Sequence, residues 1–143
     1  MREALAEDIP GVLDVYREAG IGAGISFTVE EGVAQLARMT GGSSVRVYVA
    51  VVDGRVVGTY ELFLLDNMAK RGRRSGVVED VAVLPAYQGR GVGKAMMQDA
   101  MERCRRDGCY KMMLSSNQNR ESAHAFYDSL GFERHGFSFR IDF

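Results

Sequence analysis

The stretch Gly76–Arg106, GVVEDVAVLPAYQGRGVGKAMMQDAMERCRR, decides the fold that this chain is expected to adopt. It begins with an apolar, β-branched run, typical of a strand in the middle of a sheet, and it ends with apolar residues at helical spacing. Between the two lies a turn with glycine at positions 89, 91 and 93, which opens directly into the helix. A strand, a glycine-rich loop and a helix N-terminus together present main-chain N–H groups to a phosphate. The stretch therefore predicts an α/β domain with a phosphate-binding site.

Two common phosphate-binding loops do not match this turn. A Walker A loop needs glycine where Gln88 stands and serine or threonine where Ala95 stands. A dinucleotide fingerprint needs its third glycine at the position of Lys94. What is left is the pattern Gln-x-x-Gly-x-Gly, to which Arg90 and Lys94 add positive charge.

Periodicity and turn signals divide the rest of the chain into short elements. Apolar residues recur at helical spacing after Pro10 and after the capping box of Thr28 and Glu31, and Asp53-Gly54 is a hairpin signal. We expect helices over residues 8–19, 28–39, 91–106 and 120–130, and strands over residues 2–5, 45–52, 56–64, 77–84, 110–114 and 132–143. The glycine-rich residues 20–27 are expected to form a mobile loop over the substrate or, equally, a plain connection.

Composition is that of an ordinary soluble globular protein. The 143 residues are 46% apolar and 26% charged, which suits one domain over residues 1–143. The net charge of −1 and isoelectric point near 6.1 argue against a protein devoted to nucleic acid or an anionic membrane. Neither the cysteines, Cys104 and Cys109, nor the histidines, His124 and His135, have metal-ligand spacing. With no signal peptide or spanning segment, we expect a metal-free, cytoplasmic protein.

The charges are unevenly distributed along the chain. Residues 1–40 carry seven acids and three bases, whereas residues 70–106 carry nine bases and four acids. A basic half suits a polyphosphate ligand and an acidic half suits a cationic one, although solvated helix faces would give the same counts.

Two motifs together resemble the GCN5-related N-acetyltransferases (GNAT superfamily). They are Gln-x-x-Gly-x-Gly over residues 88–93 and Phe-Tyr-x-x-Leu-Gly-Phe over residues 126–132, in the family's order and spacing. The resemblance implies a GNAT-type acyl-CoA N-acyltransferase fold of class α/β (α+β), with a mixed, mostly antiparallel sheet flanked by helices. It also implies acetyl-CoA-dependent N-acetylation of a small primary amine by direct transfer in a ternary complex.

The resemblance assigns residues to the acetyl-CoA site. The loop that wraps the pyrophosphate is Gln88, Gly89, Arg90, Gly91, Val92, Gly93 and Lys94. The pantetheine arm would pair with the backbone of Val81, Ala82 and Val83, and the N–H of Val81 would polarise the thioester carbonyl. Asn117 or Asn119 would contact the pantetheine or the substrate.

Two acids and a tyrosine are the candidate catalytic residues. Glu79 and Asp80 lie inside a strand that should be buried, where an unpaired carboxylate is unfavourable, so at least one is expected to face a wet cleft. Glu79 is the first choice to take the amine proton, with Asp80 as a substrate contact or second choice; an ion pair with a loop arginine is the alternative. The resemblance implies that Tyr127 protonates the leaving thiolate, although Tyr127 also suits a helix's apolar face.

Other functions stay open at this point. Val-Glu-Asp-Val-Ala-Val over residues 78–83 looks like part of the glucosamine-6-phosphate N-acetyltransferases, in which case the basic loop Lys70–Arg74 would meet a sugar phosphate. A CoA-binding sensor without turnover and a peptide or protein acetyltransferase are further alternatives. The alternating tail, residues 137–143, suits the homodimer that many members of the family form.

Overall fold

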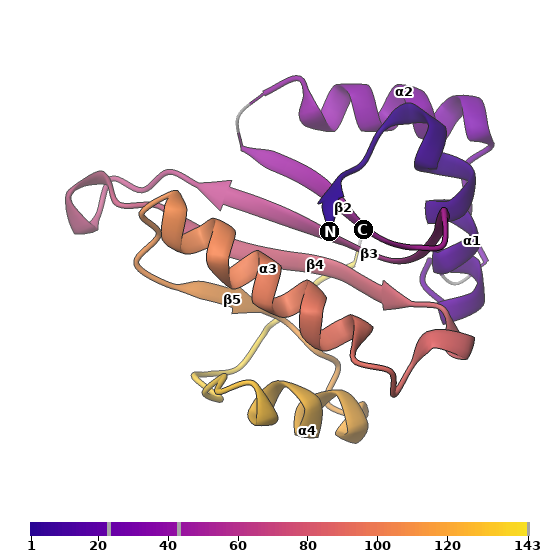
Figure 1. Cartoon of the computed structure of the whole chain (residues 1–143). Coiled ribbons are helices and arrows are strands. Elements are labelled where there is room, and N and C mark those ends of the chain that lie inside the picture. The colour runs from indigo at the N-terminus through magenta and orange to yellow at the C-terminus, as the bar shows by residue number, and fades with distance from the viewer. Residues whose placement is uncertain (23, 43, 143) are drawn as a thin grey trace. The chain divides into compact units, whose positions relative to one another are not determined.

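The structure, a computed structural model, describes residues 1–22, 24–42 and 44–142. The described chain has a mixed helix and strand architecture (Figure 1). It divides into two compact units, residues 1–113 and 114–143, and each unit is described by itself. The helices are α1 (Ile9–Ala19), α2 (Val29–Thr40), α3 (Val92–Arg106) and α4 (Glu121–Ser129). The strands are β1 (Arg2–Glu3), β2 (Val45–Val52), β3 (Arg55–Leu65), β4 (Ser75–Val83) and β5 (Met112–Leu114).

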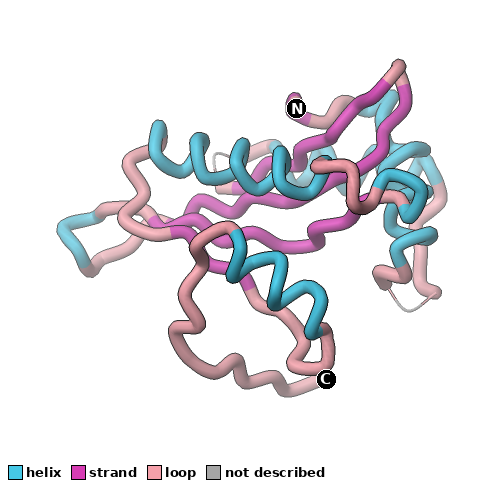
Figure 2. The backbone as a smooth tube through the Cα atoms, turned by 60° about the horizontal axis from the view of Figure 1, so that its bottom comes forward, coloured by secondary structure: helices cyan, strands magenta, loops and turns pink. Residues whose placement is uncertain are grey.

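The first unit is built on one sheet with the strand order β1-β2-β3-β4-β5. The three pairings from β1 to β4 follow the sequence order and are antiparallel. Helix α3 covers one face of this sheet, while α1 and α2 cover the other (Figures 1 and 2). This is the mostly antiparallel sheet flanked by helices that the family resemblance implies.

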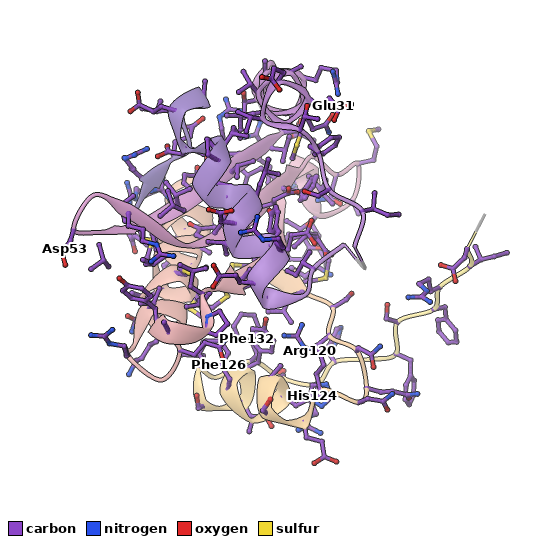
Figure 3. All side chains as sticks on the ribbon, turned by 90° about the vertical axis from the view of Figure 1, so that its right-hand side faces the viewer. Glu31, Asp53, Arg120, His124, Phe126 and Phe132 are labelled. Atoms are coloured by element: carbon purple, nitrogen blue, oxygen red, sulfur yellow. The ribbon has the colours of Figure 1, made fainter. Side chains whose placement is uncertain are left out.

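Local signals in the sequence account for the ends of the first elements. Thr28 accepts a hydrogen bond from the N–H of Glu31 at 3.2 Å, and the Glu31 carboxylate accepts one from the N–H of Thr28 at 2.8 Å, so the predicted capping box is confirmed. Asp53 and Gly54, with φ of 49° and 77°, form the two-residue turn between β2 and β3. Figure 3 shows Asp53 at the tip of this hairpin.

The core lies where α3 packs against the sheet. Gly58, Tyr60 and Leu62 of β3 point toward α3, and two glycines, Gly58 and Gly76, let the helix come close. A Cβ on Gly58 would stand 2.7 Å from the Met96 sulfur, and one on Gly76 would overlap the Cys104 sulfur. The largest fully buried side chains are Tyr60, Leu62, Leu84, Met96, Met97, Val15, Val49, Val57, Val78 and Thr59.

A polar network also ties α3 to the sheet. The Tyr60 hydroxyl donates to the Asp99 carboxylate at 2.6 Å, and Arg103 donates to the same carboxylate at 2.7 Å. The Arg103 guanidinium lies 3.9 Å from the centre of the Tyr48 ring, which is stacked on Tyr60. Although burial raises the pKa of Asp99, the hydrogen bonds from Arg103 and Tyr60 hold it below its usual value. The network therefore keeps a charged pair inside the unit.

The second unit contains α4 and the chain end. The Tyr127 ring packs 5.2 Å from Phe126 and 5.7 Å from Phe132, measured between ring centres. Figure 3 shows Phe126 and Phe132 on the same side of α4. The predicted strand over residues 132–143 is wrong for residues 132–142, which form no strand. Alternation alone does not make a strand, because the backbone also needs a neighbouring strand with which to hydrogen-bond.

Candidate active site

The glycine loop forms a helix N-terminus with free N–H groups, as predicted. Gly89 and Gly91 have φ of 70° and 85°, and Gly91 is the residue that precedes α3. The first bond of the helix runs from the N–H of Ala95 to the carbonyl of Gly91 at 3.0 Å. The three N–H groups before it, on Val92, Gly93 and Lys94, therefore have no acceptor within the helix. Such an end favours an anion.

The charged side chains of the loop are available to a ligand. Arg90 is exposed, with its guanidinium 5.2 Å from the centre of the Tyr87 ring, and Lys94 is also exposed. A shallow cavity of about 260 Å³ lies beside this helix end. Its lining residues are Met1, Ala50, Val51, Val52, Arg90, Gly91, Val92 and Ala95. The residues that are present fit a phosphate group, because they offer N–H donors and cations together.

Gln88 connects this loop to the strand before it. Its side-chain amide donates a hydrogen bond of 3.1 Å to the carbonyl of Val83, the last residue of β4. The short 3-10 turn Pro85–Tyr87 lies between them. Gln88 thus fixes the loop relative to β4, and this structural contact adds to the cofactor-binding role predicted for it.

Strand β4 contains a bulge at the predicted catalytic residues. Thr59 is paired with Ala82 and Glu61 with Glu79, so Tyr60 alone stands opposite both Asp80 and Val81. Asp80 adopts φ of 49°, in the left-handed region that few residues other than glycine occupy. The bulge breaks the simple alternation that would send Glu79 and Asp80 to opposite faces of the strand.

Beyond the bulge, the outer edge of β4 pairs with no other strand among the described residues of the first unit. β5 is joined to the start of β4, through bonds from Tyr110 to the Arg74 carbonyl and from Gly76 to the Lys111 carbonyl. With three residues, β5 is too short to extend beside residues 81–83. The N–H of Leu84 points to β3, where it donates to Val57, so Val83 and, by alternation, Val81 point the other way. This edge could receive an extended ligand such as a pantetheine arm.

Three carboxyl groups gather at the bulge, and one of them was missed by the sequence reasoning. Glu61 on β3 is half-buried and stands opposite Glu79. Burial, and then the charges of Asp80 and Glu79, raise the pKa of Glu61 to about 7. Burial and the charge of Asp80 likewise raise the pKa of Glu79. The signal for Glu61 was the same as for Glu79: an acid inside an otherwise apolar strand.

Helix α1 adds a tyrosine to the carboxyl group cluster. The Tyr16 hydroxyl is buried and has no hydrogen-bond partner of normal geometry among the described residues. Burial, and then the charges of Glu61 and Asp80, raise its pKa well above the usual value for tyrosine. Tyr16 is therefore a neutral group at any physiological pH.

The remaining predicted site residues belong to the second unit. Tyr127 is half-buried on α4, in the ring cluster described above. The Asn117 side-chain oxygen accepts a hydrogen bond from the N–H of Asn119 at 2.9 Å, and the main-chain carbonyl oxygen of Asn117 lies 2.9 Å from a ring nitrogen of His124. The structure thus brings together the loop, β4 and its acids within the first unit, and Tyr127 and the asparagines within the second.

The described residues contain no group of three or more histidine, cysteine or acidic side chains that could hold a metal ion. None of the helices in the described ranges combines the length and apolar character that crossing a membrane requires.

Comparison with known proteins identifies the family. Residues 12–132 match the acetyltransferase (GNAT) family. A glucosamine 6-phosphate N-acetyltransferase of Trypanosoma brucei brucei is 38% identical over 105 residues, which are 73% of this chain and 69% of that protein. An aminoalkylphosphonate N-acetyltransferase of Salmonella typhimurium is 29% identical over 67% of this chain and 62% of that protein. The matched part covers 55% of a probable rice glucosamine 6-phosphate N-acetyltransferase.

The fold comparison agrees. A putative acetyltransferase from Agrobacterium tumefaciens superposes with a TM-score of 0.91 at 31% identity, over 99% of this chain and 97% of that one. A Trypanosoma brucei acetyltransferase superposes with a TM-score of 0.86 at 30% identity, over the same shares of the two chains. The chain belongs to the GNAT family of acetyltransferases.

Proposed function

We propose that this protein transfers the acetyl group of acetyl-CoA directly to the primary amine of a small molecule, in a ternary complex. The observation that carries the proposal is the continuity of the open edge of β4 with the free N–H groups at the start of α3. A pyrophosphate and an extended arm need these two features side by side. The carboxyl groups at the bulge lie on the same strand as this edge.

The donor supplies an activated thioester, and the protein supplies binding, a base, an oxyanion donor and an acid. The first-turn N–H groups of α3, with Arg90 and Lys94, bind the pyrophosphate. Glu79 takes a proton from the acceptor ammonium, directly or through water, with Asp80 as substrate contact. The N–H of Val81 donates to the thioester oxygen as negative charge develops there. Tyr127 gives a proton to the leaving thiolate.

An amino sugar phosphate is the second candidate acceptor. The 38% identity to a trypanosome glucosamine 6-phosphate N-acetyltransferase favours it. The basic loop at Lys70–Arg74 is a poor phosphate site for the same molecule, because Glu79 is the fifth residue after Arg74 along β4, a distance of about 16 Å in an extended strand. Arg74 is also paired with Asp66 at 2.8 Å. If the acceptor is an amino sugar phosphate, its phosphate would therefore have to bind to residues other than this loop.

Further features of the proposal concern assembly and location. Phe137 and Phe139 are 92% and 93% exposed, and Ile141 is exposed as well, so the tail presents apolar side chains at alternate positions. Apolar surface of this kind suits burial between two copies of the chain, which sedimentation would detect. The unpaired cysteines Cys104 and Cys109 suit the reducing cytoplasm.

The decisive experiment measures the release of CoA thiol in the presence of a panel of amines: amino sugars and their phosphates, polyamines, amino acids and aminophosphonates. Release that depends on the acceptor supports the proposal. Binding of CoA without release, for every amine, would favour a sensor of the same fold. Acetylation of a peptide but of no small amine would change the acceptor class.

A further inference from the structure

Glu61 and Glu79 form a cross-strand pair of like charge on the face of the sheet that α1 covers. Their strands are antiparallel and the two residues are direct partners in the register, so their side chains leave the same face. The Cβ atoms of such partners are about 5 Å apart. Like charges at this distance are destabilising, and a fold without a use for them would place an apolar or oppositely charged residue there.

The neighbours of Glu61 do not neutralise it. Asp80, at the bulge, is a third acid. Val47, its partner on β2, is apolar, and Thr59 uses its hydroxyl to donate to the Tyr48 carbonyl at 2.9 Å. Within residues 1–22, 24–42 and 44–142, no lysine or arginine makes an ion pair or hydrogen bond with Glu61, Glu79 or Asp80. The three acids therefore lack a cation.

The Tyr16 hydroxyl is an independent sign that a ligand belongs here. It is buried against this face without a hydrogen-bond partner among the described residues, and both Glu61 and Asp80 act on it electrostatically. A buried hydroxyl without a partner is unfavourable. A group with N–H donors and positive charge, placed between Tyr16 and the carboxylates, would satisfy the hydroxyl and balance the acids together.

We propose that Glu61 and Glu79 are a proton-sharing carboxylate pair which, with the Tyr16 hydroxyl, receives the acceptor's ammonium group, an inference that rests on the proposed function. One N–H bond of the ammonium breaks, and the proton is held between the two carboxyl groups. The electron pair of that bond stays on nitrogen, which can then attack the thioester. The pair later releases its proton to water. The pKa of Glu61, raised to about 7, suits this task, because a base works best with a pKa near the working pH.

Removal of one carboxylate of the pair should change the pH profile of kcat/KM. Glu61→Gln removes the second negative charge, so Glu79 becomes a weaker base. We expect kcat/KM at pH 8 to fall about tenfold. We also expect the acid limb of its pH profile, the range in which kcat/KM falls as the pH falls, to move to lower pH. Glu102→Gln, an exposed change of the same charge on α3, is the control and leaves the limb in place.

The carboxylate pair can also be tested by a titration that does not require the protein to be active. In the protein with ¹³C-labelled glutamate carboxyl groups, we expect one group to titrate near pH 7, to be lost in Glu61→Gln and to shift to lower pH in Glu79→Gln. If no amine is acetylated by the unmodified protein, the proposed function fails and this titration alone decides the pair. An acid limb that Glu61→Gln leaves unmoved, or the absence of a carboxyl group titrating near pH 7, overturns the inference.

Discussion

The side-chain amide of Gln88 donates a hydrogen bond of 3.1 Å to the carbonyl of Val83. The contact closes the turn between the end of β4 and the start of α3, so the strand edge and the helix N-terminus keep a fixed relation. Both halves of the proposed acetyl-CoA site depend on that relation.

Replacing Gln88 with alanine should therefore loosen the loop. We expect a rise of about tenfold in KM for acetyl-CoA with little change in kcat, because positioning of the donor is lost and the chemistry is not. Gln35→Ala on α2, where Gln35 accepts a hydrogen bond from Arg38 on the surface, is the matched control. Equal KM values for Gln88→Ala and the unmodified protein would show that the contact does not support the site.

Gly91→Ala tests the N-terminus of α3. Gly91 has φ of 85°, and a side chain in this region costs about 1–2 kcal/mol. Relief of that strain would turn the first N–H groups of the helix away from the phosphate, so CoA affinity measured by calorimetry should fall. Gly108→Ala is the matched control, since Gly108 has φ of 67° just after the other end of α3 and nothing lies within 4 Å of its Cβ position. Equal losses of affinity in the two variants would exclude the anion site.

Comparison of Glu79→Gln with Asp80→Asn identifies the acid that takes the proton. Glu79 is half-buried and its pKa is raised, whereas Asp80 is exposed, so Glu79 is the better base. We expect Glu79→Gln to lower kcat about a hundredfold, most strongly at low pH where more of the amine is protonated, and Asp80→Asn to have a smaller effect. Asp53→Asn, at the hairpin tip, is the control. The reverse order of effects would give the role to Asp80.

Tyr60→Phe should destabilise the first unit. It removes the hydrogen bond of 2.6 Å to Asp99 while the ring stays in place. Chemical denaturation should show a loss of about 1–2 kcal/mol in the free energy of unfolding, against almost none for Tyr87→Phe at a half-buried tyrosine outside this network. An unchanged stability would mean that Arg103 alone satisfies the Asp99 carboxylate.

Stability should fall as the pH rises because of Glu61. The pKa of its carboxyl group is raised from 4.5 to about 7 in the folded protein, mainly by burial. Between these values the folded protein binds a proton that the unfolded chain has lost, so the free energy of unfolding decreases as the pH rises from 4.5 to 7. The loss is about 1–3 kcal/mol and is complete above pH 7. Glu61→Gln should flatten this slope, and Glu102→Gln should keep it.

Elements set by local chemistry were predictable from the sequence. The capping box of Thr28, the Asp53-Gly54 turn and the glycine loop before α3 each depend on a few neighbouring residues, and all three form as expected. The family motifs then predicted the architecture of the sheet.

Features that depend on pairing between distant segments were not predictable. The bulge at Asp80 arises from the register of β4 against β3, and Glu61 joins the acids because that register places it opposite Glu79. The tail alternates like a strand but forms none over residues 132–142. The pattern of apolar and polar side chains indicates which residues face the core. It does not indicate which strand lies beside a given strand or in what register.

The central claim is tested most directly by the rate of CoA thiol release from acetyl-CoA with and without an amine acceptor. We predict saturable, acceptor-dependent release by the unmodified protein, with the N-acetylated amine formed in equal amount. Tight binding of acetyl-CoA, with no release above the rate of hydrolysis for any amine, would contradict it.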